Sequence, residues 1–229
     1  MFDDFVKHKL TIPQENIYLI ERTNNNTNMN NIFGVFKICK KLDIEILKVV
    51  MNKIIENNDA LRIKVIENNN VPEQFIDDFK YEDIPVYILE DEDESEVNRI
   101  IRKIADKRLE MINSKLYDIR IIQNKLATYV CVKIHHINSD AWTLGQVAEQ
   151  IKEYYLKIIN NEEIEKKSSY LEYIKKDEKY RLSDKYLIDK EYWNEYVKEL
   201  DCENKFEITK DKKSRCFITR FLYATNEWR

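Results

Sequence analysis

Glycine is almost absent from this chain of 229 residues, which contains only Gly34 and Gly145. A loop that cradles phosphate groups needs clustered glycines, because the backbone must come close to the anion. The sequence therefore excludes a nucleotide site built on a Walker or dinucleotide-binding loop.

Long apolar runs and a basic excess are also missing. No stretch approaches the roughly 18–20 apolar residues that cross a bilayer, and Met1 to Leu10 lacks the apolar centre of a signal peptide. We therefore expect a cytoplasmic protein with no membrane partner. The 38 Lys and Arg residues are interspersed with 42 Asp and Glu residues, and the formal net charge is -4. Nucleic-acid binding needs a concentrated basic face, so we expect no nucleic-acid partner.

The four cysteines, Cys39, Cys131, Cys202 and Cys216, are widely spread and form no Cys-x-x-Cys pair. This spacing argues against a zinc knot or a redox motif. We expect four reduced thiols, with Cys131 buried in its apolar run as a small hydrophobic residue.

Hydrophobic residues make up 43% of the chain and aromatic residues 11%, which indicates a packed globular protein. Short apolar runs alternate with stretches of helical periodicity, without strict strand–helix–strand spacing. This pattern predicts an α/β (α+β) fold in which helices pack against a mixed sheet. We expect strands at Ile32–Cys39, Leu61–Ile66, Gln74–Ile76, Pro85–Leu89, Tyr117–Ile122 and Ala127–Ile134, turns at Asn68–Pro72 and Gln123–Lys125, and helices at Thr11–Glu21, from Asp43 to about Asn58, around Val97–Ile104, at Trp142–Ile159 and within Ser168–Leu200.

The most informative feature is the polar segment His135–Asp140, which lies where a buried strand ends and a helix begins. A rigid strand aims the side chains of such a turn, and histidine, with an unperturbed pKa near 6.5, can accept a proton at neutral pH. Asp140 can pair with an arginine and lock the loop that carries the imidazole. We therefore expect His136 at the edge of an open cleft.

Two other interpretations of this segment stay open. A histidine at a strand end is often a hydrogen-bonded structural residue. A metal site is the second alternative, because histidine and aspartate are metal ligands. Neighbouring side chains of an extended segment point apart, however, and the cysteines offer no completion of a ligand set.

The segment His135-His136-Ile137-Asn138-Ser139-Asp140-Ala141-Trp142 resembles the His-His-x-x-x-Asp-Gly motif of nonribosomal peptide synthetase condensation domains, relatives of chloramphenicol acetyltransferase. Other family motifs follow in the same order. Four segments of this chain match them: Leu10–Leu19 resembles the opening helix motif, Asn58–Arg62 the Arg-His-Glu-x-Leu-Arg motif, Ser169–Tyr173 the Tyr-x-Asp-Tyr motif and Tyr192–Trp193 the Tyr-Trp pair.

This resemblance implies a chloramphenicol acetyltransferase-like lobe with a mixed, mostly antiparallel sheet and flanking helices. It also implies a catalytic site of His136, His135, Asp140 and Arg62, in which His136 handles the proton, Asp140 pairs with an arginine and Arg62 supports the site. No metal or free cofactor is implied, because the substrates are phosphopantetheine thioesters on carrier proteins. The motif glycine is Ala141 here, and its methyl group could crowd the substrate tunnel.

The resemblance further implies that residues 1–200 form the N-terminal lobe of a condensation domain and that residues 201–229 lead towards a C-terminal lobe. The expected function is amide bond formation between a carrier-bound thioester and an amine, with carrier protein domains and the C-terminal lobe as partners. Two other functions remain open. One is a non-catalytic remnant or carrier-docking module, and the other is a glycerolipid acyltransferase, whose His-x-x-x-x-Asp motif would make His135 the base.

Overall fold

Strands and helices alternate along the computed structural model, which describes residues 5–23, 28–166 and 168–199. Short apolar runs form the strands, and amphipathic stretches form the helices that cover them. The elements are β1 His8–Lys9, α1 Ile12–Thr23, β2 Asn31–Ile38, α2 Ile44–Asn57, the 3-10 helix η1 Asp59–Arg62, β3 Ile63–Asn68, β4 Val71–Ile76, β5 Val86–Ile88, α3 Glu94–Asp106, β6 Tyr117–Gln123, β7 Thr128–His135, α4 Ala141–Ile159, α5 Leu171–Arg181 and α6 Asp184–Glu199.

The larger sheet has the strand order β2-β7-β6-β5. Its β2–β7 and β6–β7 pairs are antiparallel, and the short edge strand β5 is parallel to β6. A smaller antiparallel sheet has the order β1-β4-β3. The predicted mixed, mostly antiparallel sheet with flanking helices is therefore confirmed.

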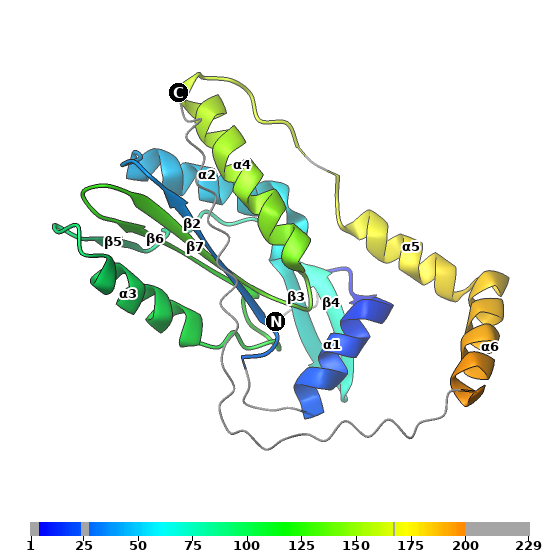
Figure 1. Cartoon of the computed structure of the whole chain (residues 1–229). Helices are drawn as coiled ribbons and strands as arrows, with labels where there is room; N and C mark the ends of the chain where they lie inside the picture. Colours follow the sequence, from blue (N-terminus) through cyan, green and yellow to red (C-terminus); the bar gives the residue numbers. More distant parts are fainter. Residues whose placement is uncertain (1–4, 24–27, 167, 200–229) are drawn as a thin grey trace, which may run out of the picture.

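Helices cover both faces of the larger sheet (Figure 1). On one face α2 and α4 contribute apolar residues such as Leu47, Met51 and Ile151 to the largest core cluster. On the other face α3 packs Val97 and Ile104 against the strands. All eight residues of β7 are buried as a result, as the almost continuous apolar run predicted.

A third core cluster joins α1 and the smaller sheet to the segment that follows β7. Leu10, Tyr18, Val65 and Leu116 contribute to it, and Ile137 inserts from the loop between β7 and α4. The buried side chain of Ile137 thereby anchors the loop that contains His136 and holds this loop between the two sheets.

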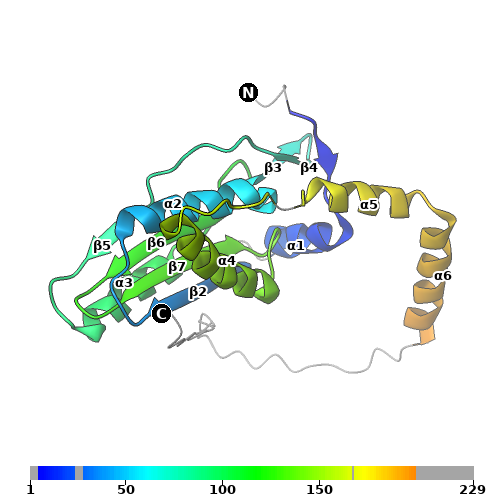
Figure 2. The ribbon, with the colours of Figure 1, turned by 90° about the horizontal axis from the view of Figure 1, so that it is seen from above.

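The last two helices lie at one end of the molecule, away from β5 (Figure 2). Helix α5 contacts the rest of the lobe and buries Ile174. Helix α6 turns away from it and, among its described side chains, buries none. The predicted connector at 201–229 and the cysteines Cys202 and Cys216 lie outside the described residues.

The structure corrects the predicted turns. The β3–β4 turn contains only Asn69 and Asn70, both with positive φ (51° and 64°), a conformation that asparagine tolerates better than most residues. Pro72, which suggested a longer turn, is instead the second residue of β4. Gln123 belongs to β6 rather than to a turn, because it pairs with Thr128.

None of the helices in the described ranges is long and apolar enough to cross a membrane.

Candidate active site

His136 is the first residue after β7, and its side chain is exposed. It lies at an open cleft of about 530 Å³ between α1, the β7–α4 loop and the start of α5. The backbone N–H of His136 donates to the carbonyl of Asn30 at 2.7 Å, which fixes the chain as it leaves the sheet. The expectation of an imidazole at a cleft edge is confirmed.

The His136 ring is oriented by one contact. Its Nδ1 atom lies 2.7 Å from the carbonyl oxygen of Ser139. Because a carbonyl oxygen can only accept, Nδ1 must carry the hydrogen, and in the neutral ring Nε2 keeps its lone pair. No group in the described part of the chain bonds this Nε2. The imidazole is therefore prepared to accept a proton at Nε2.

Short-range bonds hold the rest of the loop. Asn138 donates its backbone N–H to the carbonyl of His135 at 3.2 Å, and the Ser139 hydroxyl donates to the same carbonyl at 2.9 Å. The side-chain amide of Asn138 donates to the carbonyl of Ala60 at 2.8 Å, which ties the loop to η1. These bonds fix the carbonyl of Ser139, and with it the ring of His136.

Asp140 is the N-cap of α4. Its carboxylate accepts from the backbone N–H and the hydroxyl of Thr143, both at 2.8 Å, and the Thr143 hydroxyl accepts from the Asp140 N–H in return. These bonds, the backbone one foremost, lower the pKa of Asp140, and the nearby His136 ring adds to the effect. The predicted arginine partner is not present among the described residues. A capping box takes its place, because the carboxylate lies within reach of its own helix end.

His135 is completely buried beside His136. Its Nδ1 accepts from the Ile137 N–H at 3.1 Å, so its hydrogen is on Nε2, which faces Glu21 at 3.8 Å. Burial lowers the pKa of His135, against the attraction of the Glu21 carboxylate. Arg108 pairs with Glu21 at 2.6 Å. His135 is thus neutral and does not line the cleft.

Arg62 is not brought to the cleft. Its guanidinium donates to the carbonyls of Ile55 at 2.7 Å and Glu56 at 2.5 Å, near the C-terminal end of α2, and to the carbonyl of Asp77 at 3.0 Å. A cation suits this end of a helix, where free carbonyls gather. Arg62 contacts the framework beneath the loop rather than His136.

The far wall of the cleft comes from Tyr170 and Tyr173, whose ring centroids lie 5.3 Å apart. Asp59 of η1 fixes the start of α5, because its carboxylate accepts the Tyr170 N–H at 2.7 Å and also accepts from the Ser169 hydroxyl. The motif at Ser169–Tyr173 was visible in the sequence, but its position opposite His136 was not.

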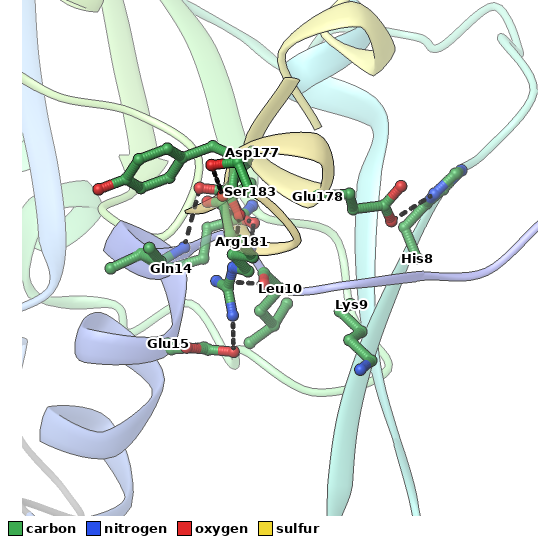
Figure 3. Close-up of polar contacts among 12 residues, drawn as sticks. His8, Lys9, Leu10, Gln14, Glu15, Asp177, Glu178, Arg181 and Ser183 are labelled. Atoms are coloured by element: carbon green, nitrogen blue, oxygen red, sulfur yellow. Dashed lines mark hydrogen bonds and ion pairs between the residues drawn. The ribbon is translucent and has the colours of Figure 1, made fainter. Parts of the chain in front are cut away.

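Arg181 holds the other end of α5 against α1 (Figure 3). Its guanidinium donates to Asp177 at 2.7 Å, to Glu15 at 2.8 Å and to the carbonyl of Leu10 at 3.0 Å. His8 adds a contact to Glu178 at 3.2 Å. Arg181 was not predicted from the sequence, because one arginine in a highly charged helix has no distinguishing pattern.

Among the residues that the structure describes, no group of three or more His, Cys, Asp or Glu side chains could hold a metal ion. Cys39 is exposed and Cys131 is buried, and both are free thiols. The burial of Cys131 agrees with the prediction, and it raises the pKa of the thiol to about 12, so Cys131 stays protonated.

Comparisons with known proteins agree with this architecture. The profile of the family described as Condensation domain matches residues 7–215. A plipastatin synthase polypeptide of Bacillus subtilis (strain 168) is 23% identical over 192 residues, which are 82% of this chain and 8% of that protein. Bacitracin synthase 1 of Bacillus licheniformis is 26% identical over 179 residues, which are 74% of this chain and 3% of that protein.

Solved structures show the same fold at low sequence identity. The starter condensation domain of rhizomide synthetase RzmA matches with a TM-score of 0.76 and 17% identity, over 83% of this chain and 50% of that chain. SgcC5 protein from Streptomyces globisporus matches with a TM-score of 0.69 and 18% identity, over 82% of this chain and 46% of that one. The predicted lobe fold is confirmed, and it spans about half the length of these structures.

Proposed function

This chain belongs to the condensation domain family, and from that premise we propose that it is an amide-forming lobe of a nonribosomal peptide synthetase. One observation carries the proposal. The Nδ1 atom of His136 is committed to the carbonyl of Ser139, so its Nε2 lone pair is left for a substrate in the cleft. The donor is a carrier-bound acyl thioester, and the acceptor is a carrier-bound amine.

The proposed reaction is an attack of the amine nitrogen on the thioester carbonyl carbon. A C–N bond forms, the C–S bond breaks, and the sulfur leaves as a thiol. His136 Nε2 accepts the proton that the amine must lose and returns it to the departing sulfur, so the ring ends the cycle neutral. The fixed ring orientation contributes by holding the base at one place near both reactants.

The other predicted site residues act on His136 rather than on the substrate. Asp140 caps α4 and closes the loop whose Ser139 carbonyl orients the ring. His135 contributes a neutral buried ring beneath the loop. Arg62 braces the end of α2 and η1, to which the loop is tied through Asn138. We assign all three to positioning.

A second lobe completes the proposed enzyme, because one lobe cannot enclose two carrier-bound substrates. The surface of α6 supports this part of the proposal. Its exposed large residues include Leu187, Ile188, Tyr192, Trp193 and Tyr196, and Tyr192, Trp193 and Tyr196 form a cluster with ring centroids 5.4–6.3 Å apart. A helix with so many exposed aromatic residues is typical of one that packs against a further protein surface.

Carrier protein domains are the proposed substrate-bearing partners, and a cytoplasmic location stays a prediction from the sequence. The Ala141 departure fits the proposal. Ala141 is exposed at the first position of α4, where alanine is a good helix former. The glycerolipid acyltransferase reading fits less well, because its base would be the buried His135.

The test is reconstitution. The chain is mixed with a separately produced C-terminal lobe of a condensation domain, an acyl-loaded carrier protein and an aminoacyl-loaded carrier protein, and the amide product is measured by mass spectrometry. We expect product with the unaltered chain and with the control Lys125→Ala, which changes an exposed residue in the turn between β6 and β7. We expect His136→Ala to abolish it. Carrier binding with no product would favour the docking module instead, and full activity of His136→Ala would refute the proposed base.

A further inference from the structure

The edge strand β5 leaves one side of its backbone open. It pairs with β6 alone, in parallel register from Val86 opposite Ile121 to Ile88 opposite Gln123. Pro85 and Leu89 bond across to β6 through Ile121 and Gln123 respectively. In a parallel pair, alternate residues face the neighbouring strand. The N–H and C=O groups of Val86 and Ile88 therefore point outward, and the described residues give them no backbone partner.

A groove runs beside this open edge. It lies between β5 and α3, has a volume of about 610 Å³ and has Ile100 and Ile104 in its floor. Ile88 is 60% exposed at its rim. An open strand edge beside an apolar groove is the arrangement that binds an extended peptide as an added strand.

The rim of the groove is cationic. Arg99, Lys103, Lys107 and Arg120 line it, against the single acidic residue Glu96. Glu96 pairs with Arg99 at 2.6 Å, and Asp118 pairs with Arg120 at 3.1 Å. Within the described ranges no carboxylate pairs with Lys103 or Lys107. Two exposed positive charges thus remain at the C-terminal end of α3, Lys103 in its last turn and Lys107 just after it.

An acidic segment, Glu90 to Asp93, enters α3 at the opposite end of the helix from Lys103 and Lys107. Because β5 leads into that segment and α3 runs back from it, the free cations flank the start of β5. A partner would therefore place its acidic side chains beside Lys103 and Lys107, away from the acidic segment Glu90 to Asp93.

From the open edge, the apolar floor and these charges, we propose that β5 and α3 form a docking site for an extended acidic segment of a partner protein, which adds as a strand to β5. The site lies at the end of the lobe away from α5 and α6 (Figure 1). It is separate from the His136 cleft and does not depend on the proposed function.

The test uses the full chain and a fluorescein-labelled peptide that alternates valine with glutamate, followed by fluorescence anisotropy. We expect saturable binding that Lys103→Glu weakens by about fivefold to tenfold, because a favourable charge contact becomes a repulsive one. Arg102→Glu is the matched control. It also replaces a cation by glutamate, one position away, on an exposed residue outside the groove. We expect its affinity to match that of the unaltered chain.

Two further measurements test the strand pairing itself. Ile88→Pro removes one outward N–H at an edge position that tolerates proline, so it should fold, as far-ultraviolet circular dichroism will show, and lose binding. The same peptide with alternate amides N-methylated should also fail to bind. No saturable binding, equal weakening by Lys103→Glu and Arg102→Glu, or full binding of the N-methylated peptide would overturn the proposal.

Discussion

His135 and His136 are neighbours in sequence with opposite environments and opposite tautomers. The His135 side chain has no exposed surface, whereas His136 lies at the open cleft. Nδ1 of His135 accepts from the Ile137 N–H, and Nδ1 of His136 donates to the Ser139 carbonyl. Neutral His135 therefore carries its hydrogen on Nε2, and neutral His136 carries it on Nδ1. The alternation of side chains at the end of a strand produces this difference.

The buried His135 should make stability depend on pH. Its folded-state pKa is lowered from 6.5, so below about pH 6.5 the unfolded chain binds a proton that the folded chain does not. Stability should therefore fall as the pH drops from about 6.5 towards 4, by at most about 1.4 kcal/mol per pH unit. Urea denaturation between pH 7 and pH 5 measures this slope.

The matched variants for this prediction are His135→Asn and His136→Asn. Asparagine at 135 keeps an acceptor for the Ile137 N–H but does not titrate, so its stability should change less with pH. His136→Asn alters an exposed ring and should keep the slope of the unaltered chain. Identical slopes for all three proteins would show that His135 is not held neutral by burial.

The cap at Asp140 should be measurable as helix stability. Asp140→Ala removes the acceptor for Thr143 and should lower the free energy of unfolding by about 1 kcal/mol. Asp140→Asn keeps an acceptor and should cost less. Since the folded pKa of Asp140 is lowered, its charge stabilises the fold above its unfolded pKa near 3.8, and this contribution is lost as the pH falls below that value. Equal stability of Asp140→Ala and the unaltered chain in urea at pH 7 would contradict the capping role.

Arg181 should control whether α5 stays against α1. Arg181→Gln cannot make all three of its bonds, to Asp177, Glu15 and the Leu10 carbonyl, and charge-assisted bonds of this kind are worth about 1–3 kcal/mol each when partly buried. Hydrogen exchange should become faster within residues 171–181 and stay unchanged in β7. Lys176→Gln, an exposed change on the same helix, is the control. Unchanged exchange in α5 of Arg181→Gln would rule out this tether.

Lys133 is a fully buried lysine in the central strand β7. Its ammonium donates to the carbonyls of Ile104 and Lys107 at the end of α3 and lies 5.8 Å from the centroid of the Phe33 ring. Lys133→Met keeps most of the packing but leaves those carbonyls without this donor, so we expect a loss of about 1–3 kcal/mol in chemical denaturation. A variant as stable as the unaltered chain would show that the ammonium contributes nothing net.

Local signals in the sequence predicted much of the site. The apolar run from Ala127 to Ile134 predicted a covered strand, whereas Asp140 was expected to pair with an arginine and caps its own helix instead. The two-residue period of a strand also predicted that adjacent histidines point apart. The inferences on the strand and on the histidines depend on residues close together in the chain, where periodicity is directly readable.

Partners far apart in sequence could not be predicted in this way. Arg62 was expected to support the site, and its guanidinium instead meets carbonyls at the end of α2. Tyr170 reaches the cleft from more than thirty residues beyond His136, and Arg181 meets Glu15 across most of the chain. Lys133 interrupts the almost continuous apolar run, and its contacts with the end of α3 were not predicted. Such pairings follow from tertiary packing, which leaves no periodic signal in the sequence.

The most direct test of the account is the tautomer of His136, measured on the chain by two-bond proton–nitrogen correlation spectra at neutral pH. His136→Asn identifies its signals. We predict that Nδ1 of His136 has the shift of a protonated nitrogen and Nε2 that of an unprotonated one, with the opposite assignment for His135. A hydrogen on Nε2 of neutral His136 would leave no lone pair facing the cleft and would contradict its role as the base.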